Sequence, residues 1–64
     1  MTMPQPQPGD IYECDGELRE VIYADPCRIH MQYRVAGEGI WEWMSAWNRW
    51  QSGATLVERK EPTQ

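Results

Sequence analysis

Apolar and polar residues alternate most regularly between positions 27 and 36. The odd positions hold Cys27, Ile29, Met31, Tyr33 and Val35, and the even positions hold Arg28, His30, Gln32, Arg34 and Ala36. A period of two places these sets on opposite faces of a β-strand. The pattern predicts a half-buried strand whose odd positions face the core.

Turn-forming residues divide the rest of the chain into segments of similar length: Pro8-Gly9, Asp15-Gly16, Asp25-Pro26, Gly37-Glu38-Gly39 and Ser52-Gly53. The apolar runs between them predict further strands over residues 10–14, 18–24, 40–44 and 54–57. Ser45 is a good helix N-cap, so a short 3₁₀ or α turn is expected over residues 45–51. The sequence therefore predicts an all-β fold of five strands, with one helical turn before the last strand.

Both ends of the chain differ in composition from its middle. Residues 1–8 alternate proline with glutamine, which favours polyproline II, and residues 59–64 are polar and contain Pro62. We expect a flexible leader over 1–8, one domain over 9–58 and a disordered tail over 59–64. A chain of 64 residues has room for one domain and little room for an enclosed substrate cleft.

The expected order, four strands, one helical turn and a fifth strand, is similar to that of SH3-like barrels. Four short motifs resemble small SH3-like proteins of undefined function encoded by prophages and bacteria: Pro8 to Glu13, the Asp15-Gly16 hairpin, Glu20 to Ile22, and Gly39 to Trp41 before a serine-led turn. The resemblance covers about residues 8–58 and implies a small five-stranded barrel. Peptide-binding SH3 domains carry an acidic loop run and a Trp-Trp pair that have no match here, so no proline-peptide binding is implied.

The charge balance bears on the partners and on the compartment. Ten acidic residues against six basic ones give a net charge of −4, which disfavours generic binding to phosphate backbones. We find neither a secretory signal nor an apolar run near the roughly 20 residues of a membrane span, and we expect a cytoplasmic protein. Cys14 and Cys27 should then stay reduced and act as small core residues.

The chain offers little for catalysis or for metal binding. Cys14, Cys27 and His30 are its only soft metal ligands, and Cys27 and His30 point to opposite faces if both lie in one strand. The same geometry argues against a cysteine nucleophile beside His30. Gly37-x-Gly39 lacks the third glycine and the long helix of a phosphate-binding loop. We expect no metal, no cofactor and no enzymatic activity.

Four tryptophans fall between positions 41 and 50. We expect Trp41 and Trp47 to fill the interior. Trp43 lies near a strand end and Trp50 follows Trp47 by three positions, so both can be partly exposed at one rim, although simple packing remains open for them. The predicted protein-binding rim consists of Trp43, Trp50, Arg49 and Glu42. Its composition is typical of interface hot spots and predicts a small accessory or adaptor protein that binds another protein, or itself.

Two alternatives remain open. The polar face of the third strand, extended by a neighbouring strand, forms a basic row that can hold single-stranded or duplex nucleic acid: Arg19, Arg28, His30 and Arg34. The same residues can instead pair with Glu17 and Glu20 across the sheet. A phage-type inhibitor that imitates nucleic acid would use the acidic residues Asp10, Glu13, Asp15, Glu17 and Glu20.

Overall fold

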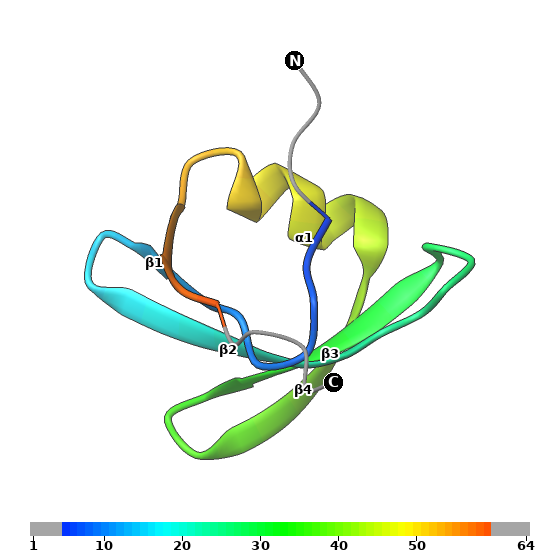
Figure 1. The fold of residues 1–64 in the computed structure, drawn as a ribbon, viewed down its shortest axis with the longest axis horizontal. Coiled ribbons are helices and arrows are strands. Elements are labelled where there is room, and N and C mark those ends of the chain that lie inside the picture. Colours follow the sequence, from blue (N-terminus) through cyan, green and yellow to red (C-terminus); the bar gives the residue numbers. More distant parts are fainter. Residues whose placement is uncertain (1–4, 60–64) are drawn as a thin grey trace.

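A computed structural model describes residues 5–59 of the chain. They form one antiparallel sheet with a single helix packed against it (Figure 1). In chain order the elements are β1 (Ile11–Cys14), β2 (Glu17–Ala24), β3 (His30–Val35), β4 (Glu38–Trp43), α1 (Met44–Gln51) and β5 (Thr55–Glu58). The predicted mainly β fold, with five strands and one short helix before the last strand, is confirmed.

The strands lie in the order β4-β3-β2-β1-β5, and each is antiparallel to its neighbours. The helix connects β4 to β5, which form the two opposite edges of the sheet. Within residues 5–59 the sheet is not closed, so the barrel closure implied by the resemblance is not seen. An open sheet of this kind leaves two strand edges available.

Two-residue turns join β1 to β2 and β3 to β4. Both central residues of each turn have positive φ angles: 51° and 86° at Asp15 and Gly16, and 51° and 83° at Ala36 and Gly37. Positive φ at both positions is the backbone conformation of type I′ hairpin turns. The sequence predicts the first turn at its observed place, whereas the second lies one residue before the expected glycine turn.

The turn between β3 and β4 determines which side chains of β4 reach the core. It makes β4 begin at Glu38 and pairs Ile40 with Tyr33, whose side chain is buried. Ile40 therefore shares the core face, and Trp41 points to the opposite face, where it is 59% exposed. The prediction that Trp41 fills the interior is wrong.

The third predicted strand begins three residues later than expected, at His30, because Asp25 organises a turn before it. The Asp25 carboxylate accepts hydrogen bonds from the N–H groups of Cys27 (3.3 Å) and Ile29 (3.4 Å). Arg28 donates its N–H to the carbonyl of Asp25 (2.9 Å) and has a φ of 61°, which breaks the extended backbone. Cys27 is exposed in this turn, so its predicted place in the core is also wrong.

The helix α1 follows β4 directly, with Trp43 in the N-cap position. No side chain caps it, so the predicted role of Ser45 is wrong. The N–H of Met44 instead donates to the carbonyl of Ile29 (3.0 Å), which ties the start of the helix to the turn before β3. No helix in residues 5–59 has the length and apolar character needed to cross a membrane.

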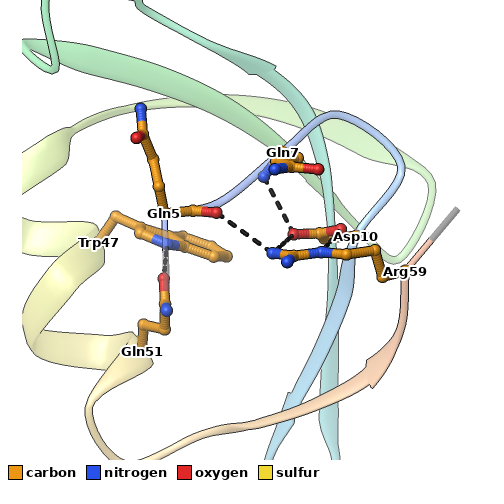
Figure 2. Close-up of polar contacts among 6 residues, drawn as sticks. All are labelled: Gln5, Gln7, Asp10, Trp47, Gln51 and Arg59. Carbon is orange, nitrogen blue, oxygen red and sulfur yellow. Dashed lines mark hydrogen bonds and ion pairs between the residues drawn. The ribbon is translucent and has the colours of Figure 1, made fainter. Parts of the chain in front are cut away.

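The core lies between α1 and the sheet and is centred on Trp47, which is fully buried as predicted. Its ring packs edge-to-face on Tyr12, with centroids 5.7 Å apart, and lies 5.4 Å from Tyr33. The indole N–H donates to Oε1 of Gln51 one helical turn later (2.7 Å), as Figure 2 shows. The buried apolar side chains are Tyr12, Val21, Met31, Tyr33, Met44 and Trp47.

Asp10 ties the two ends of the described chain together (Figure 2). Its fully buried carboxylate accepts hydrogen bonds from Nε (3.0 Å) and Nη2 (2.8 Å) of Arg59 and from the backbone N–H of Gln7 (3.0 Å). Arg59 also donates to the carbonyl of Gln5 (3.2 Å), and Pro6 is buried. These contacts hold the last described residue against the first ones.

The folded unit therefore extends past the expected bounds of 9–58 at both ends. The predicted flexible leader contacts the domain from Gln5 onward, and Arg59, assigned to the tail, is bound to Asp10. The rest of the predicted leader and tail, residues 1–4 and 60–64, lies outside the described residues.

Candidate binding surface on the outer face of the sheet

The face of the sheet opposite to the core carries an aromatic cluster. Register pairs His30 with Trp43, and Gln32 with both Trp41 and Tyr23, so these side chains share one face. It is the outer face, because the intervening Met31 is fully buried in the core. We define the aromatic face as Tyr23, His30, Trp41 and Trp43.

Three of these rings contact one another. The centroids of His30 and Trp41 are 5.5 Å apart, and Tyr23 lies 5.9 Å from each of them. The rings are nevertheless open to solvent, since Trp41 is 59% exposed and Trp43, at the end of β4, is 65% exposed. Large apolar side chains that gather and stay exposed are typical of binding surfaces.

A groove of about 380 Å³ runs along this surface, lined by His30, Trp41, Glu42 and Trp43. Glu42 pairs with the core residue Met31, so its side chain leaves β4 on the other face from Trp41 and Trp43. Its carboxylate accepts a hydrogen bond from the backbone N–H of Trp43 (3.0 Å), which holds it close to the backbone of β4 beside the groove. The Nδ1 atom of His30 lies 3.5 Å from a carboxylate oxygen of Asp25. The groove thus combines aromatic rings with one carboxylate beside the backbone of β4 and another behind His30.

The predicted rim is divided by the structure. Trp43 and Glu42 line the groove, whereas Trp50 is half-buried, with its ring centroid 5.0 Å from that of Trp47. Arg49 is exposed in the last turn of α1. Neither Trp50 nor Arg49 belongs to the lining of the groove, so the four predicted rim residues do not form one surface.

The predicted basic row is also divided. Arg19 lies on the core side of the sheet, with its guanidinium 4.5 Å from the ring centroid of Tyr33 and 4.2 Å from that of Trp50. Arg28 lies in the turn before β3 and donates to Oε1 of Gln5 (2.9 Å). Only His30 and Arg34 remain on the outer face. Arg19 therefore does not extend the row, because its place in β2 turns it inward.

The predicted acidic stripe is broken for related reasons. Asp10 is buried against Arg59, and Glu17 pairs with Arg19. Glu20 pairs with Arg34 at 3.0 Å. These acids are neutralised one by one rather than presented as a single row of free charge.

Neither cysteine belongs to the aromatic face, and neither is a strong candidate nucleophile. Cys14 and Cys27 are free thiols. Partial burial, followed by the charges of Asp15, Glu13 and Glu17, raises the pKa of the Cys14 thiol, which disfavours the nucleophilic thiolate. Within residues 5–59 no three His, Cys, Asp or Glu side chains come together as a metal site.

Comparison with known protein families, with curated proteins and with solved structures finds no match to this chain.

Proposed function

We propose that this protein is a non-catalytic binding module that docks another protein through its aromatic face. The observation that supports this most strongly is the pair of indoles, Trp41 and Trp43, left 59% and 65% exposed beside a groove. The sequence predicted a binding rim that contains Trp43 and Trp50, whereas in the structure it is Trp41 that lies exposed beside Trp43. Tryptophan is the residue type most enriched among interface hot spots.

The two exposed indoles can supply a substantial part of a binding free energy. A buried indole contributes about 150 to 250 Å² of surface, so covering the exposed part removes roughly 100 to 150 Å² from water for each ring. At about 25 cal/mol per Å², each ring contributes about 3 kcal/mol before the costs of association. Two such rings offset much of the cost of association, and the contacts around them must supply the rest.

Binding to nucleic acid is the weaker candidate on the same face. Its stacking surface suits unpaired bases. Against it stand the carboxylate of Glu42 beside the groove and that of Asp25 behind His30. The pairing of Arg34 with Glu20 also leaves few free cations on this face for phosphates.

The proposal includes a cellular compartment and a relationship to a protein family. The free thiols of Cys14 and Cys27 suit a reducing, cytoplasmic compartment. The proposal keeps the kinship with small SH3-like proteins encoded by prophages and bacteria, with which the order of the elements agrees.

The test is capture of partners by the purified protein and by the double variant Trp41→Ala/Trp43→Ala. Val57→Ala is the matched control, because Val57 is 57% exposed on β5 at the opposite edge of the sheet. We expect wild type and Val57→Ala to retain the same protein in direct binding with purified components, and the double variant to lose it. Sedimentation detects the case in which that partner is a second copy.

The proposal is wrong if the double variant, shown to be folded by circular dichroism, retains every partner with unchanged affinity. Fluorescence anisotropy with single- and double-stranded oligonucleotides covers the second candidate. Steeply salt-dependent binding to these probes, without a protein partner, would favour nucleic acid instead.

A further inference from the structure

We propose that the groove of the aromatic face receives a cationic side chain, an arginine or a lysine, from an extended basic segment of the partner protein. This inference rests on the proposed function and specifies the chemistry of its partner. Three features of the groove support it: its rings, its charge and its position at a sheet edge.

The rings offer two indole surfaces to a cation. Trp41 and Trp43 are two residues apart on one face of β4, so their Cα atoms are separated by about 7 Å. A cation within about 6 Å of a ring centroid is attracted by the negative face of the ring, and tryptophan provides the strongest such contact. His30 on β3 and Tyr23 on β2 both contact the ring of Trp41, which reduces the entropy lost when a ligand packs on it.

The local charge selects a cation over an anion. Glu42 is one of the residues at the groove, and its carboxylate is held beside the backbone of β4 by the N–H of Trp43, within reach of a long cationic side chain at this edge. The carboxylate of Asp25 lies behind His30. The arginine on the same face, Arg34, already forms an ion pair with Glu20. A guanidinium or an ammonium therefore meets both π-faces and negative charge, whereas a phosphate is repelled.

The edge position favours an extended segment as the carrier. In a hairpin with a two-residue turn, the residues next to the turn, Val35 and Glu38, form a hydrogen-bonded pair, and bonded positions then alternate along β4. The N–H and C=O groups of Gly39 and Trp41 consequently point away from β3. In the described part of the chain β4 is an edge strand, so an added strand can pair with these groups. Alternate side chains of that strand then reach the aromatic face.

The probe for this proposal is a short capped peptide in which arginine alternates with threonine. Its control is the same peptide with each arginine replaced by citrulline, which has nearly the same shape but no charge. The ¹⁵N-labelled protein is titrated with each peptide at low ionic strength. The four tryptophans give separate indole N–H signals that report on each ring.

We expect saturable shifts at the indoles of Trp41 and Trp43 and at the amide of Gly39, with no shift at the buried indole of Trp47. The citrulline peptide should bind at least about tenfold more weakly. Trp43→Ala and Glu42→Gln should each weaken binding of the arginine peptide by about two- to thirtyfold, the range expected for loss of a contact to a cation. Glu58→Gln, which removes an exposed charge on β5, is the matched control and should leave the affinity unchanged.

Equal affinity for the two peptides, or equal weakening by Glu42→Gln and Glu58→Gln, overturns the proposal, because either result reduces binding to shape or to bulk charge. Shifts of the same indoles by a single-stranded oligonucleotide but not by the arginine peptide also overturn it. If binding of a captured partner depends on Trp41 and Trp43 but the arginine peptide does not compete with it, the proposal of a cationic side chain in the groove is wrong and the proposed function stands. If no partner depends on these tryptophans, the proposed function itself fails.

Discussion

Replacing Arg59 by alanine should destabilise the protein far more than removal of an ordinary surface charge. The Asp10 carboxylate that Arg59 binds is only 1% exposed, whereas the arginine side chain is 35% exposed. Arg59 donates two of the three hydrogen bonds that this carboxylate accepts from Gln7 and Arg59. The substitution therefore leaves a buried negative charge without its counter-ion.

The expected loss follows from this geometry. A hydrogen bond to a charged group contributes about 1.5 to 3 kcal/mol, and removing one partner of a fully buried ion pair costs about 3 to 5 kcal/mol. Because water reaches the exposed third of Arg59, we expect Arg59→Ala to lower the free energy of unfolding by about 2 to 4 kcal/mol. A chain of 64 residues has about 3 to 10 kcal/mol in total, so this is a large share.

Urea denaturation followed by tryptophan fluorescence measures the loss, and a double-mutant cycle with Asp10→Ala isolates the pair. The coupling energy should be about 1.5 to 3 kcal/mol. Arg34→Ala is the control, since its pair with Glu20 is solvent-exposed and should contribute less than about 1 kcal/mol. If Arg59→Ala costs no more than Arg34→Ala, or if the coupling is near zero, the two ends of the chain are not tied as described.

Three further predictions concern the turn, the core and the pH dependence. Gly37→Ala should destabilise the protein by about 1 kcal/mol, because φ is 83° at this position. Gly39→Ala should be nearly neutral, because the added methyl group meets only the movable end of the Gln32 side chain, at 2.9 Å. Equal losses of stability in urea denaturation would contradict this. Trp47→Ala should lose about 3 to 5 kcal/mol by the same assay, because the ring is fully buried, and a loss under about 1 kcal/mol contradicts this. Burial raises the pKa of Tyr12 above its ordinary value of 10.0, so the unfolded chain loses this proton first and stability should fall above about pH 10, by up to about 1.4 kcal/mol per pH unit. Denaturation across this range should show a flatter slope for Tyr12→Phe, and an identical slope refutes the assignment.

The order of the elements was predictable because each strand and turn depends on residues close in sequence. The alternation from Met31 to Val35 and the Asp15-Gly16 turn are local signals, and both appear in the structure as expected. The start of β3 was not predictable from alternation alone. The apolar and polar pattern continues through residues 27–29, but the hydrogen bonds of the Asp25 side chain fold them into a turn.

The candidate surface was predicted only in part, because it depends on the register of β4. A shift of one residue in a hairpin moves every side chain to the other face. The expected glycine turn does not fix this register, whereas a turn at Ala36-Gly37 pairs Ile40 with Tyr33 and turns Trp41 outward. This turn is the signal in the sequence that identifies Trp41 as part of the surface.

The tie between Asp10 and Arg59 was beyond sequence analysis for a different reason. The two residues are 49 positions apart, Arg59 lies in the expected tail, and Asp10 is a charged residue at the start of a predicted strand. Their pairing depends on β1 and β5 lying side by side, which brings the ends of the described chain together.

The most direct test of the account is the indole N–H spectrum of the ¹⁵N-labelled protein with its captured partner, recorded with saturation transferred from the partner. We predict that the signals of Trp41 and Trp43 lose intensity, while that of the buried Trp47 does not. Transfer to Trp50 alone, with Trp41 and Trp43 unaffected, would contradict the claim that the outer aromatic face is the binding surface.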